Sequence, residues 1–498
     1  YGYADLLIAG LMAGLMLLIM GLLKLGTLIK YIPRPVTVGF TSGIAVIIFT
    51  GQIGYFLGLS NVERHEYFLD NMREIIIHFN TVNVYSIIVA VVCLVIIIFT
   101  PRFFPRIPGP LMGLLVSTVV ATVLFPDKVA TIGSTFGEIP NRFPDFQFPD
   151  ITWEKIRQLL MPAFVIAMLG GIESLLSAVV ADGIAGTKHN SNRELIGQGI
   201  ANIVTPLFGG IPATGAIART ATNIKSGAAT RLSGVISALT VLAVLLVLAP
   251  YAYHIPLASM APILMVVAWN MSERRVFAHI LLTKTGDSLV LLTTFLLTVF
   301  TNLVTGVQFG LIFAAILFIK RMSKILTVVP VLPDPDDRKV SPHVVHEGRH
   351  CPQISMFTIE GPLFFGAAQM FEQSVMVTIH HRPNVLILRM GKVPYMDTTG
   401  ELNFKSIVRH FHKQGGTILI TGLQLQPQRV LQRTGLYEEI GAHHFFEHTG
   451  EAIDFALTKL DIKKCQGCKH FAFNECTRLS KEQPLNLNKR ITQAGSTE

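Results

Sequence analysis

Long apolar blocks separated by short polar turns fill the first 325 residues of the chain. Several blocks reach the roughly 17–25 residues that an α-helix needs to cross a hydrocarbon core of about 30 Å. The shorter blocks suit tilted, broken or paired helices. The pattern predicts a polytopic α-helical membrane domain over residues 1–325. The clearest blocks are Leu6–Leu23, Val36–Leu59, Val84–Thr100, Leu111–Phe125, Leu160–Val180, Val235–Leu248, Leu289–Val304 and Leu311–Ile319.

The pattern changes after residue 325. Residues 326–349 are rich in proline and charge, which predicts a linker. Residues 350–462 alternate short apolar strands with amphipathic helices, which predicts a small α/β domain with a largely parallel sheet. Residues 463–498 form a polar, cysteine-containing tail, and we expect Leu485–Glu498 to be disordered. The expected strands are Ile354–Phe365, Asn384–Arg389, Thr417–Gly422 and His444–Phe446, and the expected helices are Ala367–Ile379, Thr399–Lys413, Gln426–Gly435 and Ala452–Leu460.

Composition supports a membrane protein. Hydrophobic residues make up 50% of the chain and charged residues only 15%, against about 25% in a typical soluble domain. The net charge is +9, but the basic residues are scattered, so nucleic acid is not an expected partner. Three basic residues follow the last apolar block: Lys320, Arg321 and Lys324. By the positive-inside rule they predict a multi-pass protein of the cell membrane whose C-terminal region is cytoplasmic.

One apolar stretch, residues 173–223, carries several ionisable residues and ends in a segment broken by glycine and proline, GGIPATGAIART. Ionisable groups and interrupted helices are costly inside a bilayer and usually mark the binding site of a transported ion. Among them are Glu173, Asp182, Arg193, Glu194 and Arg219.

Two regions of the membrane domain have the same hydropathy order around an Ile-Pro pair, Ile32-Pro33 and Ile255-Pro256. This predicts two inverted repeats. The second repeat begins near Gln158, so the first lacks roughly 65 residues, about three helices by span length. We therefore expect the chain to be N-terminally incomplete, without its first three spans.

The 173–223 stretch resembles the signature of the sulfate permease (SulP) family of anion transporters, through ESLLSAVVADG, HNSNREL-GQG-AN and GG-P-TG-IARTATN. The C-terminal domain resembles a STAS domain. The resemblance implies a fold of two inverted seven-span repeats, a core domain that moves against a gate domain, and a homodimer. It also implies an anion site between the N-termini of two half-helices, the third and tenth spans, of which the tenth corresponds to Pro212–Lys225 and the third lies in the missing part.

The half-helix supplies the candidate anion-binding residues. Free N–H groups and the helix dipole favour an anion, Thr214 can donate a hydroxyl hydrogen bond, and Arg219 adds positive charge. The alternative is a small-residue packing contact with Arg219 paired to a carboxylate. The candidates are Thr214, Gly215, Ala216, Ala218 and Arg219.

By the same resemblance, Glu173 occupies the place of a coupling carboxylate, and Ser177 lies one helical turn along the same face. Together they are candidates for a proton or sodium site, with a static Glu173–Arg219 pair as the alternative. The polar cluster that follows predicts loop and capping structure, with Asn192 capping the next helix and Glu194 in its first turn.

Two motifs in the C-terminal region have competing interpretations. In MDTTG, Thr398 is a candidate phosphorylation site, but helix capping by Asp397 or Thr398 is favoured, with Gly400 easing close packing. The set Cys465, Cys468, His470 and Cys476 is a permissible tetrahedral zinc set. Reduced free thiols are favoured over zinc, and a redox role is third, so no metal or cofactor is predicted.

The sequence predicts secondary active transport of a small anion by an elevator-like movement, with sulfate first and bicarbonate or a dicarboxylate as rivals. Coupling to H⁺ or Na⁺ and a cytoplasmic protein partner of the STAS domain are further expectations. The alternative is a non-transporting membrane sensor acting through its STAS domain; nucleobase–cation symport is disfavoured by that domain. No enzyme motif is present, and without a Walker loop direct driving by ATP is not expected.

Overall fold

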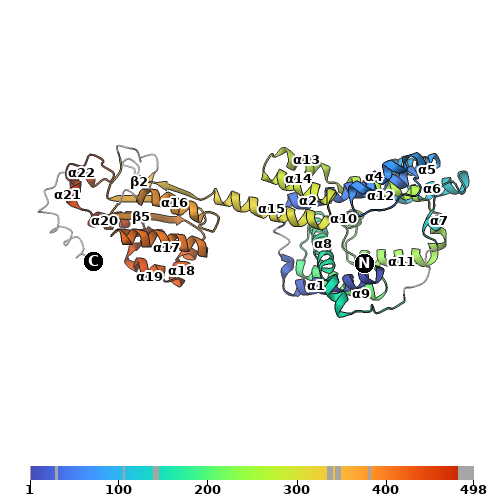
Figure 1. Ribbon diagram of the computed structural model, residues 1–498, viewed down its shortest axis with the longest axis horizontal. Helices are drawn as coiled ribbons and strands as arrows, with labels where there is room; N and C mark the ends of the chain where they lie inside the picture. Colours follow the sequence, from blue (N-terminus) through green and yellow to red (C-terminus); the bar gives the residue numbers. More distant parts are fainter. Residues whose placement is uncertain are drawn as a thin grey trace. The chain divides into compact units, whose positions relative to one another are not determined.

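The chain forms two compact units, Tyr1–Ala314 and Ala315–Glu498, in a computed structural model (Figure 1). The structure describes residues 2–27, 32–104, 107–137, 145–333, 340–341, 349–379 and 383–480, and of residues 218, 225, 340–341 and 377–379 only the backbone. The expected disordered segment, Leu485–Glu498, lies outside the described residues, as do most residues of the predicted linker.

The apolar blocks become helices, as predicted. Within the described residues, six helical spans are long and apolar enough to cross a membrane. They are α1 (Tyr3–Leu22), α2 (Arg34–Gly51) together with α3 (Ile53–Leu57), α5 (Val84–Phe103), α8 (Trp153–Ala185), α11 (Leu232–Ala252) and α15 (Leu303–Ser323). Two shorter apolar helices are α6 (Gly109–Leu124) and α14 (Gly286–Phe300). The remaining helices are α4 (Phe68–Ile77), η2 (His78–Thr81), α7 (Ile132–Phe136), α9 (Ser191–Leu207), α10 (Ile217–Lys225), α12 (Leu257–Met271) and α13 (Arg274–Leu282).

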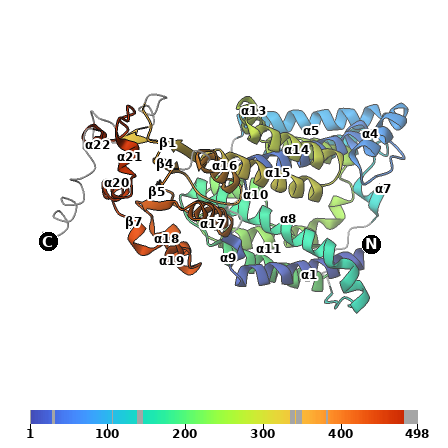
Figure 2. The ribbon, with the colours of Figure 1, turned by 60° about the vertical axis from the view of Figure 1, so that its left-hand side comes forward.

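Helix packing divides the membrane unit into two groups. Helix α1 packs along α9 and α8, and α8 also packs on α10. In the second group, α2 packs on α14 and α12, and α5 packs on α6 and α12. Figure 2 shows α1 and α9 along the lower side of this unit and α5, α13 and α14 along its upper side. Phe40 of α2, Ile172 of α8 and Val307 of α15 form an apolar cluster between the groups.

Glycines let α1 and α9 approach backbone to backbone. A Cβ added at Gly14 would lie 2.7 Å from the carbonyl carbon of Asn202, and one added at Gly199 would lie 2.6 Å from the backbone nitrogen of Leu18. Small residues at such a crossing replace side-chain contacts with direct backbone packing, which is the usual way that helices associate closely in membranes.

The two Ile-Pro pairs occupy equivalent positions in the fold. Pro33 is the N-cap of α2 with φ −67° and ψ 140°, and Pro256 is the N-cap of α12 with φ −70° and ψ 137°. The two helices then pack on each other. This matched local geometry agrees with the predicted correspondence between the two regions.

The C-terminal unit contains the predicted α/β domain. Its five-stranded sheet has the order β1-β4-β5-β6-β7, in which β4 to β7 are parallel and β1 is an antiparallel edge strand. The strands are β1 (Thr327–Pro330), β4 (Ile354–Glu360), β5 (Val385–Lys392), β6 (Thr417–Thr421) and β7 (Phe445–Phe446), beside a separate β2 (Leu332–Pro333) and β3 (Val340–Ser341) pair. The helices are α16 (Ala368–Ile379), α17 (Thr398–Lys413), α18 (Leu425–Arg433), α19 (Leu436–Ile440), η3 (Ala442–His444), α20 (Thr449–Thr458), α21 (Ile462–Cys465) and α22 (Cys476–Leu479).

Helices cover both faces of this sheet, because the side chains of its central strand alternate between two buried cores. Leu386 and Leu388 of β5 enter the core that contains Phe404 of α17, whereas Val385 and Ile387 enter the core that contains Ala452 of α20. Burial on both faces explains the nearly continuous apolar sequence of the strand.

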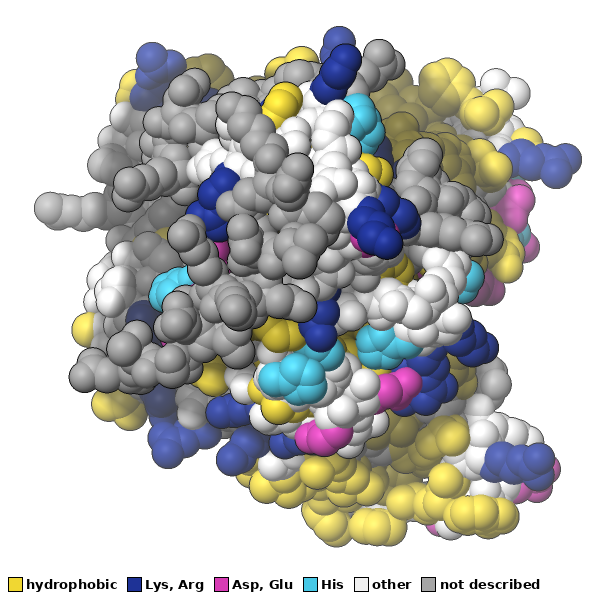
Figure 3. All heavy atoms as spheres, turned by 90° about the vertical axis from the view of Figure 1, so that its left-hand side faces the viewer, with side chains coloured by type: hydrophobic (Ala, Val, Ile, Leu, Met, Phe, Trp, Pro, Cys, Tyr) yellow, Lys and Arg dark blue, Asp and Glu magenta, His cyan; other side chains and the backbone are white. Residues whose placement is uncertain are grey.

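The structure extends this domain at both ends. Strand β1 falls within the predicted linker, and Ala472 and Phe473 of the predicted tail are buried in the second core. Figure 3 looks onto the C-terminal unit, where Lys, Arg and His side chains are scattered among residues that the structure does not describe.

Candidate functional site

The predicted half-helix begins later than expected. Helix α10 starts at Ile217, and Thr214, Gly215 and Ala216 lie in the non-helical segment before it. Pro212 and Gly215 explain the correction, because proline lacks an N–H donor and glycine disfavours a helix interior. The predicted range Pro212–Lys225 therefore consists of a non-helical approach followed by a nine-residue helix.

A chain of hydrogen bonds ties this segment to α8. The Gly215 N–H donates to Ser174 Oγ at 3.1 Å, Ser174 Oγ and Thr214 Oγ1 are 2.8 Å apart, and Thr214 Oγ1 donates to the Gly170 carbonyl at 2.8 Å. Ser174 and Thr214 have one hydroxyl proton each. If Ser174 donates its proton to Thr214 and Thr214 donates to Gly170, each of these bonds has one donor. The Thr214 hydroxyl and the Gly215 N–H are thus committed to α8, and in this arrangement they position the segment.

The same face of α8 contacts α10 one turn further on. Ser177 Oγ donates to Thr220 Oγ1 at 3.0 Å, so Ser177 faces α10. Glu173 lies one turn before Ser177 on the same helix and is half-buried. In the described part of the chain Glu173 forms no hydrogen bond or ion pair, so the static pair with Arg219 is not formed.

Helix α9 fixes the other end of the segment through a buried amide. Asn202 Oδ1 accepts the Ala213 N–H at 2.8 Å, and Asn202 Nδ2 donates to the Ala213 carbonyl at 2.8 Å. Gln198, one turn earlier, also donates to that carbonyl. Sequence reasoning gave neither residue a role, although both occur in the GQG-AN motif. Polar residues four apart on the buried face of a membrane helix are the signal that could have found them.

The start of α10 is left open. Ala216 is the N-cap and provides no side-chain hydrogen bond, and the Thr220 N–H makes a helical bond to the Ala216 carbonyl at 2.9 Å. The N–H groups of residues 217–219 precede that bond, and the first N–H groups of a helix have no partner within it. Arg219 is exposed, and among the described residues it forms no ion pair. This helix terminus is therefore suited to an anion.

The polar cluster after α8 forms a structured turn, as expected, but with a different cap. Asp182 Oδ2 accepts the His189 N–H at 2.9 Å and lies 2.7 Å from His189 Nδ1. Asn190, not Asn192, caps α9 by accepting the N–H groups of Asn192 and Arg193. The correction follows from the helix boundary, because a cap must precede the first helical residue and α9 begins at Ser191.

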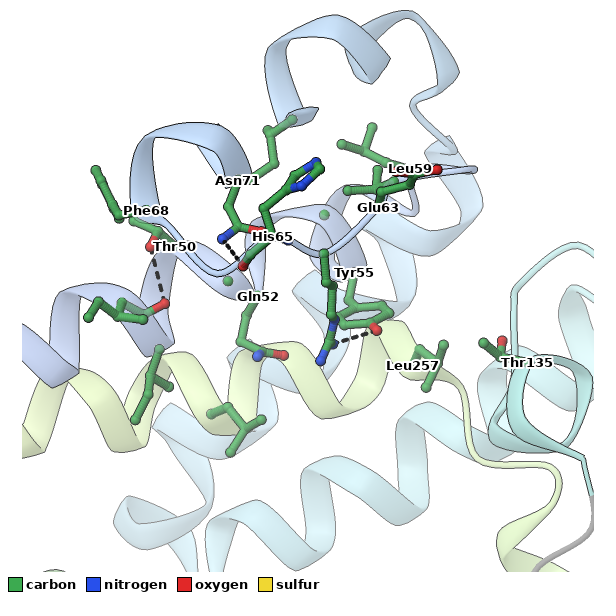
Figure 4. Close-up of a pocket in the computed structure, with 18 of the residues that line it drawn as sticks. Thr50, Gln52, Tyr55, Leu59, Glu63, His65, Phe68, Asn71, Thr135 and Leu257 are labelled. Carbon is green, nitrogen blue, oxygen red and sulfur yellow. Dashed lines mark hydrogen bonds between the residues drawn. The ribbon is translucent and has the colours of Figure 1, made fainter. Parts of the chain in front are cut away.

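A cavity of about 1340 Å³ lies in the second helix group and reaches Val165 and Leu169 of α8. Figure 4 shows polar side chains on its wall, among them Tyr55, whose hydroxyl accepts a hydrogen bond from Arg64 at 2.5 Å, and Asn71, which donates to the His65 carbonyl at 2.8 Å. None of the candidate anion residues lines it. The cavity thus approaches α8 next to Gly170 without including the α10 terminus.

The MDTTG motif starts α17 and is capped by Asp397. Asp397 Oδ1 accepts the Gly400 N–H at 2.8 Å, and Oδ2 accepts the Phe365 N–H at 2.9 Å. Thr398 is the first helical residue and is exposed. A Cβ at Gly400 would lie 2.5 Å from the Leu363 carbonyl oxygen, so the expected close packing is present. The capping interpretation accounts for this motif.

The C-terminal cysteines lie around one small cavity, together with a residue that the sequence did not suggest. Cys465, Cys468, His470 and Cys476 line it, and so do Cys351 and His350. As positioned, no three Cys, His, Asp or Glu side chains of the described residues form a metal-ligand group. Burial raises the pKa of the Cys351 thiol to about 11 and also raises the pKa of Cys465 and Cys476. Reactive redox cysteines have lowered pKa values, so these thiols do not resemble them.

Comparisons with known protein families agree with the two units. The model of the sulfate permease family matches residues 2–294, and the model of the STAS domain matches residues 347–452. YvdB of Bacillus subtilis (strain 168), described as a proposed sulfate transporter, is 54% identical over 91% of this chain and 83% of its own length. The bicarbonate transporter BicA of Picosynechococcus sp. is 32% identical over 86% of this chain and 76% of its own length.

Two solved structures are similar in fold. The murine anion transporter Slc26a9 in the inward-facing state has a TM-score of 0.79 at 20% identity, covering 90% of this chain and 75% of its own. The transmembrane domain of a cyanobacterial BicA has a TM-score of 0.52 at 33% identity, covering 63% of this chain and 76% of its own. The helical transporter fold with a C-terminal STAS domain is therefore confirmed.

Proposed function

Because the chain belongs to the sulfate permease family, we propose that it carries a small anion across the membrane and binds it at the N-terminus of α10. Sulfate is the first choice, and bicarbonate or a dicarboxylate is the rival, since the relatives include named transporters of sulfate and of bicarbonate. The observation that supports the site is the uncapped start of α10 beside Arg219. Free N–H groups, the helix dipole and a guanidinium all favour an anion.

Within this proposal, the candidate residues have two roles. Thr214 and Gly215 position the segment through Ser174 and Gly170, while Ala216, Ala218 and Arg219 place backbone and charge next to the anion. Selectivity then depends on how the helix terminus is held, because a displacement of about 1 Å at a site can cost two orders of magnitude in rate.

The two helix groups supply a structural basis for alternating access. The first group, α1 with α8, α9 and α10, carries the proposed site. The cluster between the two groups is apolar and consists of Phe40, Ile172 and Val307. A surface without specific polar bonds opposes sliding less than one with hydrogen bonds in fixed register. We propose that the first group moves against the second in an elevator-like manner.

Coupling is assigned to Glu173 and Ser177. Glu173 has no partner in the described part of the chain, and an unpaired carboxylate inside a membrane marks a functional site by default. We propose that a proton or Na⁺ binds there. We also propose a cytoplasmic STAS domain that is available to a protein partner, which the basic residues in the last turn of α15 support, and a homodimeric transporter.

The test is uptake by the full-length protein in proteoliposomes. Labelled sulfate, bicarbonate and fumarate are offered with and without a proton or sodium gradient. Saturable uptake of at least one anion is expected, and absence of flux for all three contradicts transport and favours the sensor alternative.

Two variants test the site assignment. Arg219→Ala should weaken apparent anion affinity about 10- to 100-fold, since a hydrogen bond to a charged group is worth about 1.5–3 kcal/mol. Arg231→Ala is the matched control, because Arg231 is also exposed and lies after α10. Glu173→Gln should remove the dependence on the cation gradient. Unchanged affinity in the first variant rejects the anion site, and unchanged cation dependence in the second rejects the coupling site.

A further inference from the structure

Three cysteines of one short segment and a fourth that is distant in sequence, Cys351, surround one very small cavity. Cys351 lies just before β4, Cys465 ends α21, Cys468 lies in the turn after it, and Cys476 begins α22. All four line a cavity of about 20 Å³. A cavity of roughly 10–15 Å³ already holds one water molecule, so this one has room for a single small guest.

Hydrogen-bond donors are directed at the sulfur atoms. The Phe473 N–H donates to Cys476 Sγ at 3.4 Å, and Gln353 Nε2 donates to Cys465 Sγ at 3.4 Å. Donors of this kind stabilise negative charge on sulfur and are the usual outer-shell partners of metal-bound ligands.

The local backbone brings two of the cysteines together. In the Cys465–Cys468 turn, the Cys468 N–H donates to the Cys465 carbonyl at 3.1 Å. Gly467 has φ +75°, a conformation that only glycine adopts without strain. A compact C-x-x-C turn of this kind is the common half of a structural zinc site, and the other half needs two more ligands from elsewhere in the chain.

We propose that Cys351, Cys465, Cys468 and Cys476 bind one structural Zn²⁺ ion, which fastens residues 462–479 to the start of β4. Without metal, the described side chains do not form a ligand group as positioned, so the sulfurs must rotate inward to about 2.3 Å from the ion. Four thiolates then fill a tetrahedral shell and leave no open position. Such a closed shell is typical of a structural site.

Cys351 replaces His470 in the set that the sequence suggested. The His470 ring lies against the His350 ring, with centroids 4.0 Å apart and planes tilted by 48°, and both rings line the same cavity as the sulfurs. Cys351 is half-buried against the second core, where Cys476 also packs. The structure therefore favours a four-sulfur site over a site with three sulfurs and one imidazole.

The attachment explains how the tail segment holds its place. Helices α21 and α22 have four residues each, too few to be stable alone. Yet Phe473 between them is only 2% exposed and packs in the core with Val385 and Ile387. A metal that closes the long loop between Cys351 and Cys476 offsets the entropy of ordering this segment.

Metal analysis of the full-length protein, purified without chelator or metal-affinity resin, tests the proposal. About one zinc per chain is expected, as for other structural sites. Cys351→Ser and Cys468→Ser should lose most of it, whereas His470→Ala and the control Cys93→Ser should keep it; Cys93 lies buried in α5. Absence of zinc from the reduced protein, iron in its place, or zinc lost in His470→Ala but kept in Cys351→Ser overturns the assignment.

A second measurement needs no variant. Removing metal from the wild-type protein with a chelator should speed hydrogen exchange of residues 462–479 at least tenfold, and added Zn²⁺ should restore it. Replacement by Co²⁺ should give the thiolate-to-metal charge-transfer absorption of a four-sulfur site. Exchange that chelation leaves unchanged also overturns the proposal.

Discussion

Two helices of this protein start in nearly the same way, α10 in the membrane unit and α17 in the STAS domain. In each case a side-chain amide bonds both the N–H and the carbonyl of a residue just before the helix: Asn202 with Ala213, and Gln426 with Met396. The two differ at the N-cap. Asp397 closes the start of α17, while Ala216 leaves the start of α10 without a side-chain bond.

We propose that this difference separates the structural start of α17 from an anion-binding start at α10. The amide fixes the approaching chain in both units, so it does not distinguish them. The cap decides whether the first N–H groups are satisfied internally or remain for a ligand. On that criterion α17 is complete in itself, which agrees with an exposed Thr398 that makes no contribution to capping, and the open start of α10 suits the anion proposed above.

Removing the amide in the membrane unit should have the largest effect. Asn202→Leu removes the partner of the Ala213 N–H and one of the two side chains that donate to its carbonyl, at a cost of about 0.5–1.5 kcal/mol for each hydrogen bond. Uptake should fall at least 100-fold, and the detergent-solubilised protein should unfold at a lower temperature. Gln426→Leu is the counterpart and should destabilise the STAS domain instead. Normal uptake by Asn202→Leu would show that the clamp does not position the site.

Giving α10 the cap that α17 has should remove transport without unfolding the protein. Ala216→Asp supplies an acceptor for the free N–H groups, worth about 0.5–2 kcal/mol, and places a negative charge where the anion binds. Uptake should fall about 10- to 100-fold, because a hydrogen bond to a charged anion is worth about 1.5–3 kcal/mol. Thermal stability should be kept or raised. Ala229→Asp, an exposed position after α10, is the control. Unimpaired uptake in Ala216→Asp would place the anion elsewhere.

Removing the cap from α17 should have a moderate effect confined to the STAS domain. Asp397→Ala loses the bonds to Gly400 and Phe365 and should cost about 1–2 kcal/mol. Hydrogen exchange across residues 363–401 of the full chain measures the loss. Asp454→Ala, at an exposed position of α20, should leave it unchanged. Equal protection in both variants would reject the capping role.

The smallest effect is expected at Thr398. Thr398→Ala changes an exposed side chain outside the cap and should alter stability by less than about 0.5 kcal/mol. Uptake should also stay the same. A phosphate on Thr398 of the protein isolated from its host, together with altered uptake in this variant, would restore the regulatory interpretation.

The sequence predicted what depends on hydrophobic pattern. The apolar blocks became helices, and the alternation after residue 350 became a largely parallel sheet, because both signals sum over many residues. It also identified residues 173–223 as the candidate ion-binding segment, because charged residues in an apolar stretch are a strong signal of such a site.

Features that depend on contacts distant in sequence escaped prediction. Pro212 and Gly215 disfavour a helix locally, so the later start of α10 at Ile217 was open to prediction, but the bonds from Thr214 and Gly215 to α8 that hold the non-helical segment were not. The cap of α9 moved by two residues, from Asn192 to Asn190, although both are good caps. Cys351 was missed because only the fold brings it next to Cys465 and Cys476.

The glycine contact between α1 and α9 bears on how natural variation in this chain should be interpreted. Gly14 touches no candidate ligand group, yet an added methyl there would press on the backbone of Asn202 itself, 2.7 Å away. A survey of tolerated substitutions would thus rank Gly14 beside the residues proposed to bind the anion, as intolerant as Arg219. The positions of α1 that do not tolerate mutation would be those that pack behind the proposed binding site, not those that contact the anion.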